Sequence, residues 1–204
     1  MNKPEKEIHH FFIETAKELH PNLANAITTV GVQELPVENS EPLAHRLCRS
    51  VAQQQLSVKA ARTIWGRVLE AANETPLTDF FHDQNVELLH TCGLSKAKTR
   101  AICGIAEVSR NGGLEACELK FMDYKSRTDR LTSLWGVGRW TADMISIFYF
   151  GDEDIWPDGD LAARKTLEKL TSRRRKTIRT AERFAPYRSY LALYMWKYQD
   201  TIPD

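Results

Sequence analysis

The most constraining feature of this sequence is a turn, Gly136-Val137-Gly138, that joins two segments of helical periodicity. The first segment ends in Leu131 and Leu134, and the apolar positions of the second are Ala142, Ile145, Phe148 and Tyr149. Glycine permits positive φ and close approach of another backbone, so the chain can reverse here within a few residues. Because a helix begins directly after the turn, its unpaired N–H groups and its dipole favour an anion such as a phosphate. The alternative is a tight turn that only reverses the chain.

An acidic turn follows the second helical segment. Trp156-Pro157-Asp158-Gly159-Asp160 presents two carboxylates immediately before another helical pattern. The glycine hairpin and this turn together resemble the helix-hairpin-helix DNA glycosylases, in which an essential aspartate follows a Gly/Pro-rich stretch. Within that superfamily the chain looks most like the 3-methyladenine DNA glycosylase II branch, which excises alkylated bases.

A second match lies in the segment SVAQQQLSVKAA, residues 50–61. Three glutamines in a row are by themselves an ordinary polar loop, and Ser57 is a plausible N-cap for the helix that follows. The segment is similar to a signature of the alkylation-repair branch, where this junction enters the minor groove and fills the gap left by the extruded base. The resemblance implies that Gln54, Gln55, Leu56 and Ser57 contact DNA, with Leu56 as the apolar wedge.

Basic residues and the hairpin extend the predicted contact with DNA. The segment GLSKAKTRAI, residues 93–102, is similar to a family segment near the DNA backbone, which implies phosphate contacts for Lys96 and Lys98. A solvated helix end explains the same residues. The hairpin residues expected at the DNA are Gly136, Val137, Gly138, Arg139 and Thr141. The basic run at residues 173–179 is by default a solvated connector, and a phosphate role is the alternative.

Composition limits the class of protein. With 204 residues, 28 Lys plus Arg and 27 Asp plus Glu, the chain carries a formal charge of +1, so any affinity for DNA must come from local patches. No apolar run approaches the roughly 20 residues of a membrane span, and the polar start lacks the form of a secretory signal. We therefore expect a cytoplasmic or otherwise intracellular protein, nucleoid-associated if bacterial, with no membrane partner.

The cysteines and histidines form no metal motif. Cys48, Cys92, Cys103 and Cys117 include no C-x-x-C pair, and no cysteine follows Cys117, where related endonuclease III-type glycosylases hold an iron–sulfur cluster. The six histidines form neither H-x-x-x-H nor H-E-x-x-H. We expect no iron–sulfur cluster and no required cofactor. Hairpins of the family often bind a monovalent cation, which the resemblance places on the main-chain carbonyls of Thr132, Leu134 and Val137.

The periodicity predicts an almost wholly α-helical protein, because no alternating β-type run of useful length occurs. The resemblance implies a two-lobed helical fold with a central DNA-binding groove. We expect residues 1–204 to form a single catalytic unit and to act as a monomer. Its helical lobes are expected at roughly 48–152 and at 1–47 plus 153–204.

Asp160 is the candidate catalytic residue. Breaking the C1′–N bond gives the sugar oxocarbenium character, and a carboxylate facing C1′ stabilises that charge and orients the attacking water. Asp160 follows Trp156 at the spacing of the essential aspartate in this branch, whereas Asp158 comes too early. The alternative is that Asp160 only caps the next helix, and the two roles are compatible.

Recognition of the base is expected to rest on aromatic side chains. Cationic alkylated bases are already good leaving groups, and an electron-rich ring attracts them. The candidate pocket residues are Trp140, Trp196, Trp135, Met144 and Tyr149, and core packing is the alternative for each aromatic. Met144 stands where some relatives place a tyrosine, and Gly159 where some place a second acid. These departures leave the substrate range open.

Trp140 also bears on the reaction type. Bifunctional relatives place a lysine two residues after the second hairpin glycine, and its amine attacks C1′. Here that residue is Trp140, and neither its indole nor Arg139 can act as the nucleophile. The sequence predicts a monofunctional glycosylase that flips alkylated bases from double-stranded DNA and hydrolyses their bond without strand cleavage. The alternative is a non-catalytic helix-hairpin-helix DNA-binding protein, and Trp140 disfavours a glycosylase for oxidised bases.

Overall fold

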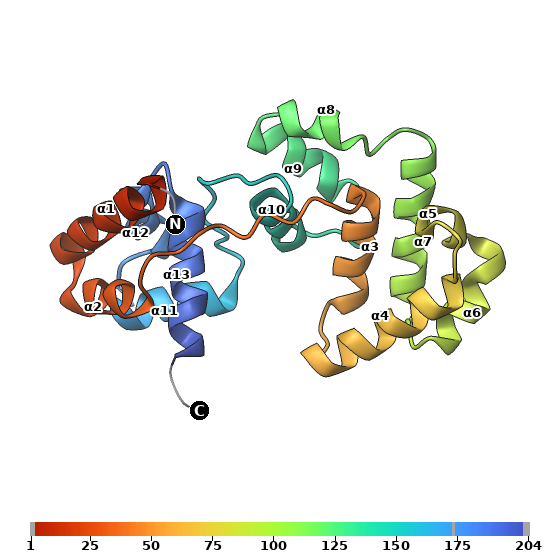
Figure 1. The fold of residues 1–204 in the computed structure, drawn as a ribbon, viewed down its shortest axis with the longest axis horizontal. Helices are drawn as coiled ribbons and strands as arrows, with labels where there is room; N and C mark the ends of the chain where they lie inside the picture. The colour runs from red at the N-terminus through yellow and green to blue at the C-terminus, as the bar shows by residue number, and fades with distance from the viewer. Residues whose placement is uncertain (1–2, 173, 202–204) are drawn as a thin grey trace. The chain divides into compact units, whose positions relative to one another are not determined.

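The computed structural model describes residues 3–172 and 174–201, and within these ranges the chain forms helices joined by turns, without a strand (Figure 1). The predicted all-α class is confirmed. Arg173 of the basic run lies outside the described residues. The contacts divide the chain into two compact units, which are Met1–Val37 with Gly151–Asp204 (unit 1) and Glu38–Phe150 (unit 2). The boundary expected at residue 48 falls inside a helix, and the division in the structure precedes that helix.

Unit 1 combines the two ends of the chain. Its elements are α1 (Lys3–Leu19), α2 (Pro21–Val30), α11 (Leu161–Leu170), α12 (Thr177–Ala181), a 3-10 turn (Glu182–Phe184) and α13 (Arg188–Asp200). In its core the ring of Phe12 lies 4.8 Å from that of Phe184 and 5.2 Å from that of Tyr194, measured between centroids. Helix α13 packs against both α2 and α11, so the C-terminal helix joins the two ends into one core.

Unit 2 holds the middle of the chain. Its elements are α3 (Leu43–Gln53), α4 (Val58–Ala72), α5 (Leu77–Phe80), a 3-10 turn (Asp83–Asn85), α6 (Val86–Thr91), α7 (Lys96–Arg110), α8 (Ala116–Phe121), α9 (Tyr124–Thr132) and α10 (Arg139–Phe148). Helix α3 packs against α4, α7 and α10. It buries the stripe Leu43, Leu47, Cys48 and Val51, one face of an amphipathic helix.

Helices α9 and α10 form the predicted hairpin, and buried polar side chains join them. The Tyr124 hydroxyl donates to Asp143 Oδ1 at 2.5 Å, and Arg139 contacts the same oxygen at 3.1 Å. Burial raises the pKa of Asp143, although Tyr124 and Arg139 oppose that shift. Deeper in the pair, buried Arg127 donates to Ser146 Oγ at 3.2 Å. Because each of these groups is costly to bury alone, the network specifies how the two helices pack.

The two hairpin glycines have different physical roles. Gly136 has a φ of +86°, and a Cβ there would lie 2.6 Å from the Cβ of Ala101 on α7. Gly138 is the N-cap of α10 with φ −90°, and a Cβ there would meet nothing within 4 Å. Gly136 is therefore required by the fold, whereas Gly138 leaves open space at the start of a helix.

We expect Gly136→Ala to lower the free energy of unfolding by about 2–4 kcal/mol, because positive φ and overpacking against α7 both oppose a side chain. Gly138→Ala is the matched control and should cost at most about 1 kcal/mol. Urea denaturation of the two variants measures the difference. Equal stabilities would contradict the role given to Gly136.

Candidate functional site

The start of α10 is the predicted phosphate-binding end, and it is built from main chain. Val137 is buried and its N–H donates to Leu134 O at 3.1 Å, which closes the turn. Gly138 caps the helix without a side chain, and its carbonyl accepts from Ala142 N at 3.0 Å. The N–H groups of the first helical turn have no acceptor within the helix, and the dipole adds positive potential there. Because Gly138 is exposed and a Cβ there would meet open space, a phosphate can reach this end.

The junction between α3 and α4 is attached to this hairpin by one amide. Gln54 Nε2 donates to Gly136 O and to Thr141 Oγ1, both at 3.2 Å. Gln55 next to it adopts a positive φ of 56°, which is uncommon for a residue other than glycine. Leu56 is 36% exposed, and Ser57 caps α4 by accepting from Ala60 N at 3.3 Å. The exposed Gln55–Ser57 segment is thereby held beside the hairpin.

Lys98 supports the same junction from α7. Its Nζ donates to the carbonyls of Ala52 and Gln54 at 2.8 and 2.7 Å, and burial lowers the pKa of its ammonium group. These carbonyls lie at the C-terminal end of α3, where main-chain carbonyl groups have no N–H partner within the helix. Lys98 is therefore positioned as a cap for α3. Lys96, predicted together with it, is exposed and lines a different hollow.

A pocket of about 700 Å³ lies between the junction and the hairpin. Gln54, Gln55, Leu56, Gly136, Gly138 and Thr141 line it, together with the predicted Trp140 and Met144. Trp140 is 42% exposed, so an aromatic surface is accessible there. Phe148 closes the apolar side. Within unit 2, the pocket brings the predicted wedge segment, the phosphate-binding end and one predicted pocket aromatic together.

Sequence reasoning missed the α3 wall of this pocket. Arg46, Arg49, Ser50 and Gln53 line it at spacings of three and four residues, on the polar face opposite the buried stripe of α3. Arg49 contacts Glu41 at 2.6 Å and Arg46 contacts Glu38 at 3.2 Å. The helical period of these polar residues was the signal that could have identified them.

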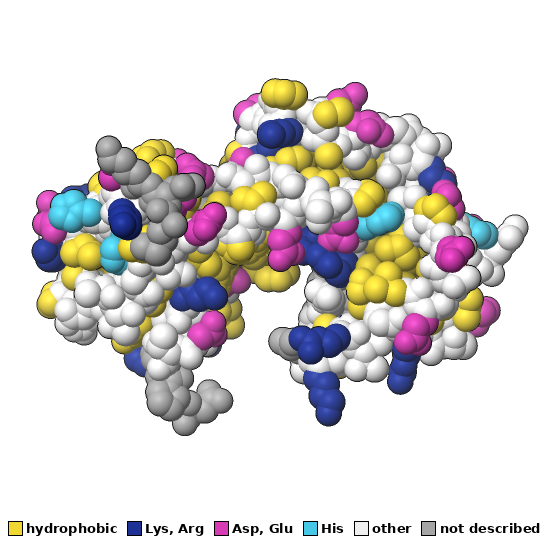
Figure 2. Space-filling view, viewed as in Figure 1, with side chains coloured by type: hydrophobic (Ala, Val, Ile, Leu, Met, Phe, Trp, Pro, Cys, Tyr) yellow, Lys and Arg dark blue, Asp and Glu magenta, His cyan; other side chains and the backbone are white. Residues whose placement is uncertain are grey.

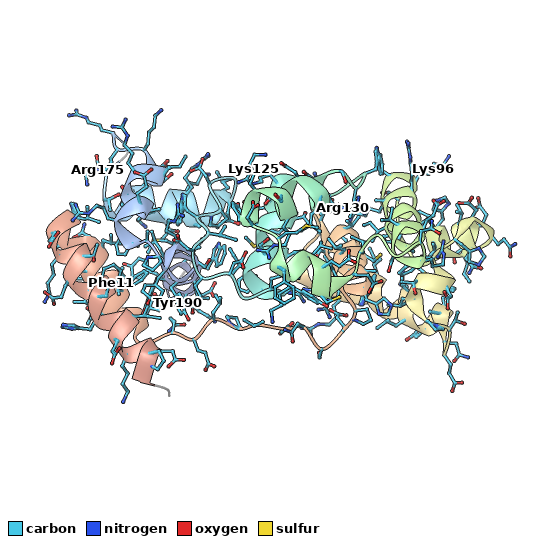
Figure 3. All side chains as sticks on the ribbon, turned by 90° about the horizontal axis from the view of Figure 1, so that it is seen from above. Phe11, Lys96, Lys125, Arg130, Arg175 and Tyr190 are labelled. Carbon is cyan, nitrogen blue, oxygen red and sulfur yellow. The ribbon has the colours of Figure 1, made fainter. Side chains whose placement is uncertain are left out.

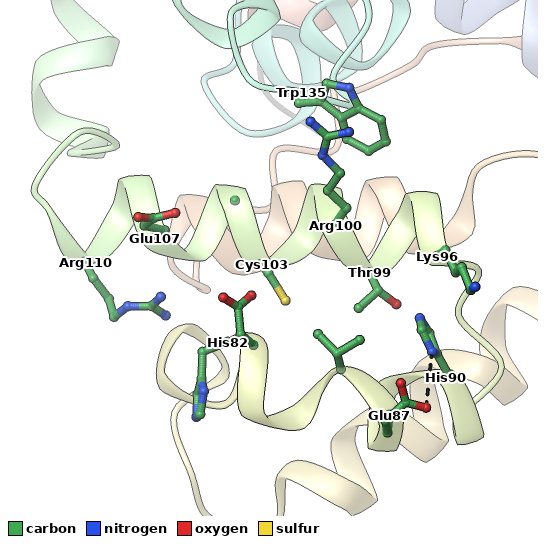
Figure 4. Close-up of a pocket in the computed structure, with 13 residues that line it drawn as sticks. His82, Glu87, His90, Lys96, Thr99, Arg100, Cys103, Glu107, Arg110 and Trp135 are labelled. Atoms are coloured by element: carbon green, nitrogen blue, oxygen red, sulfur yellow. Dashed lines mark ion pairs between the residues drawn. The ribbon is translucent and has the colours of Figure 1, made fainter.

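Two other predicted pocket aromatics of unit 2 lie elsewhere. Trp135 lines a separate hollow along α7, where the Arg100 guanidinium stacks 4.6 Å from its ring (Figure 4). Tyr149 is buried, and its hydroxyl donates to Glu41 O at 3.0 Å, so it belongs to the core of unit 2. Arg139, expected at the DNA, is held by Asp143 and by the Tyr124 hydroxyl at 2.9 Å.

In unit 1, Asp160 is the N-cap of α11, a role that the sequence offered as the alternative to catalysis and as compatible with it. Its Oδ1 accepts from Ala163 N at 2.8 Å and from the indole N–H of Trp196 at 2.9 Å. The residue is 9% exposed. The side chain of Asp158 is engaged differently, because its Oδ1 accepts from Thr177 Oγ1 at 3.1 Å. Trp196, predicted as a stacking residue, is thus a hydrogen-bond donor that orients the Asp160 carboxylate.

The loop before Asp160 is attached to the start of α13. Arg188 donates to both carboxylate oxygens of Asp154, at 2.6 and 2.9 Å. Ser189 Oγ donates to Asp152 O at 2.6 Å and accepts from Ile155 N at 3.0 Å. Since α13 also carries Trp196, one helix fixes both the loop and the carboxylate.

The described residues contain no cluster of three His, Cys, Asp or Glu side chains that could hold a metal ion. No helix in the described ranges is long and apolar enough to cross a bilayer. Of the three carbonyls expected to hold a monovalent cation, that of Leu134 accepts the Val137 N–H. A carbonyl oxygen has a second lone pair, so this bond leaves it able to bind a cation.

Known proteins resemble this chain over most of its length, although no family model matches it. It is 32% identical over 169 residues to DNA-3-methyladenine glycosylase 1 of Schizosaccharomyces pombe, covering 79% of this chain and 74% of that protein. The crystal structure of DNA-3-methyladenine glycosidase from Bacillus halodurans superposes with a TM-score of 0.79 at 28% identity, covering 93% and 89% of the two chains. A solved S. pombe 3-methyladenine DNA glycosylase in complex with abasic DNA gives 0.78 at 27% identity, covering 94% and 95%.

The contacts of Lys98 predict a structural effect that Lys96 lacks. Lys98→Met should lower the free energy of unfolding by about 1–3 kcal/mol, because two carbonyls of α3 lose charged donors. Lys96→Met should change it by less than about 0.5 kcal/mol, since Lys96 is exposed. Thermal and urea unfolding of both variants compare them. If Lys98→Met is as stable as Lys96→Met, the capping role is wrong.

Proposed function

Because the chain belongs to the DNA-3-methyladenine glycosylase family, we propose that it hydrolyses the N-glycosidic bond of alkylated purines such as 3-methyladenine in duplex DNA. The enzyme acts in base excision repair and binds DNA. The observation that carries the proposal is the Asp160 carboxylate, held by Ala163 and Trp196 at the start of α11. Relatives named for the same activity share the fold over nearly the whole chain.

The DNA backbone is bound at the start of α10 and the minor groove by the wedge segment. The main-chain N–H groups after Gly138 take a phosphate, with Val137, Gly138 and Thr141 at the contact. Gln55, Leu56 and Ser57 are exposed and enter the groove, where Leu56 fills the space of the flipped nucleotide. Gln54 and Lys98 keep this segment in register with the hairpin. Arg139 begins α10 and adds positive potential at this end, and Lys96, exposed at the start of α7, is a further cation for the DNA backbone.

The extruded base is recognised mainly by Trp140. Its accessible ring and the thioether of Met144 line one pocket, and an aromatic face attracts a cationic base. Phe148 adds apolar surface. Trp135 and Tyr149 take no part in this pocket, since one stacks with Arg100 and the other is in the core. Selectivity for alkylated bases then depends on charge more than on hydrogen bonds.

Asp160 stabilises the oxocarbenium ion and directs water to C1′. A carboxylate next to a developing positive charge lowers the barrier most when it is already oriented, because no reorganisation is then needed. The two donors to Oδ1 provide that orientation. Trp196 therefore acts as a positioning residue. A cationic alkylated base leaves as a neutral molecule and needs little protonation. One carboxylate, that of Asp160, is therefore enough for the reaction.

We assign no required cofactor, and the enzyme acts as a monomer. The carbonyls of Thr132, Leu134 and Val137 would hold a monovalent cation, which would supply positive charge next to the phosphate-binding end. Neutral carbonyl oxygens suit such an ion, and they leave the hydrolytic step to Asp160.

Asp160→Asn tests the catalytic assignment. Asparagine keeps an oxygen that can accept from Ala163 and Trp196, so the fold and DNA binding should survive while base release falls by about 10²-fold or more. Asp158→Asn is the matched control and should retain most activity. Release of free 3-methyladenine from methylated DNA measures both. Normal release by folded Asp160→Asn would transfer the role to Asp158.

The product should be an intact abasic strand. Trp140 and Arg139 cannot form a Schiff base, so borohydride should trap no protein–DNA adduct on lesion-containing duplex. A gel that separates abasic from nicked strands reports cleavage at the same time. Nicking as fast as base release would contradict hydrolysis and direct attention to Lys59 and Lys165.

A further inference from the structure

Unit 1 carries a concentration of basic side chains that the proposed site does not use. Arg174, Arg175, Lys176 and Arg179, called here the basic patch, are all exposed and line a hollow of about 720 Å³. Arg175 projects away from the ribbon (Figure 3). Among the described residues, none that lines this hollow is acidic. The patch is therefore a local region of positive potential.

Several other basic side chains of the protein are ion-paired. Lys125 pairs with Asp129, Arg164 with Glu168 and Arg188 with Asp154. Basic and acidic side chains are interspersed over the visible face of both units (Figure 2). None of the four patch residues forms an ion pair within the described part of the chain. In a protein of net charge +1, four exposed cations without an ion pair thus lie within residues 174–179.

Local structure keeps these charges together. Ser172 Oγ accepts from Arg174 N at 3.2 Å, and Ser172 O accepts from Arg175 N at 3.2 Å, which folds the turn after α11. Thr177, buried at the start of α12, donates to Asp158 and attaches the other end of the turn. Arg179 follows on α12. Like charges repel at this density, so a fixed turn that groups them indicates an anionic partner.

The chemistry of the patch fits a chain of phosphates. The arginine guanidinium is planar and donates two parallel hydrogen bonds to a phosphate, and three of the four residues are arginines. Their side chains surround a broad hollow instead of one buried point, so they suit several phosphates in succession. DNA is a polymer with regularly spaced phosphates, and it is the proposed substrate of this protein.

We propose that the basic patch is a second contact with the DNA backbone, independent of base sequence. Its residues are different from those that line the pocket at Trp140. This inference rests on the proposed function only in that DNA is the substrate. Its role is to supply affinity for undamaged DNA while the enzyme searches for a damaged base. The net charge of the chain is too small to attract DNA over its whole surface. The affinity it provides falls steeply with salt.

The test is the salt dependence of binding to a lesion-free duplex. Replacing Arg174, Arg175 and Arg179 together by Ala should reduce the slope of log Kobs against log salt by about 3, close to one per lost phosphate contact. The same three positions changed to Lys should keep nearly the wild-type slope. A charge-matched control replaces the exposed Lys6, Lys120 and Lys125 by Ala and should leave the slope unchanged. Circular dichroism checks that each variant is folded.

Several outcomes would overturn the proposal. One is an unchanged slope in the alanine variant, and another is an equal loss in the control, which would make net charge the cause. Binding of the wild type to phosphatidylglycerol vesicles, lost in the alanine variant while DNA binding persists, would assign the patch to a membrane surface. Base release by the wild-type protein from methylated DNA is measured separately. If it is normal while the slope is unchanged, only the patch proposal fails.

Discussion

The hydrogen bonds of the Gln54 side chain are the constraint on which the candidate DNA-binding surface depends. This one amide joins the end of α3 to a carbonyl of the hairpin and to a hydroxyl of α10. Lys98 holds the main chain of the same residue from a third helix. The exposed segment that follows is therefore held at a fixed support, although Gln55 has an uncommon backbone conformation. A wedge that must offset the lost stacking of a nucleobase benefits from such a support, because little conformational entropy is then lost on binding.

The positive charges near the hairpin are largely engaged within the protein. Arg139 is bound to Asp143 and Tyr124, Lys98 to two carbonyls, and Arg49 to Glu41. A guanidinium already paired with a carboxylate attracts a phosphate less than an unpaired one does. If the pocket at Trp140 takes the extruded base as proposed, its contacts with DNA must come from main-chain N–H groups and apolar surface. Non-specific attraction to phosphates would then depend more on cations without an ion pair, such as those of the basic patch.

Local signals in the sequence predicted the helices well and their tertiary partners poorly. The N-caps Ser57 and Asp160 were identified because a cap needs only the following few residues. By contrast, Gln54 meets Gly136 across 82 residues of sequence, and no periodicity encodes that contact. The same limit applies to Trp140 and Tyr149. A helical pattern shows that one face is apolar, but it does not show that Trp140 is exposed and Tyr149 is buried. The short helices α8 and α12 have no side-chain cap, and α12 begins inside the basic run that was expected to be a connector.

Trp196 illustrates how a single contact changes the meaning of a residue. A tryptophan near the end of the chain was expected to stack on a base, and the structure adds a second contact, because its indole N–H donates to Asp160. That bond fixes the ring as well as the carboxylate, so the acid and its orienting donor form one element of unit 1. The accessible ring of Trp140 belongs to unit 2. The ring proposed to recognise the base and the carboxylate proposed to stabilise charge are therefore carried by different compact units. If both roles hold, a substitution that destabilises the core of either unit should reduce activity even when it leaves these two side chains unchanged.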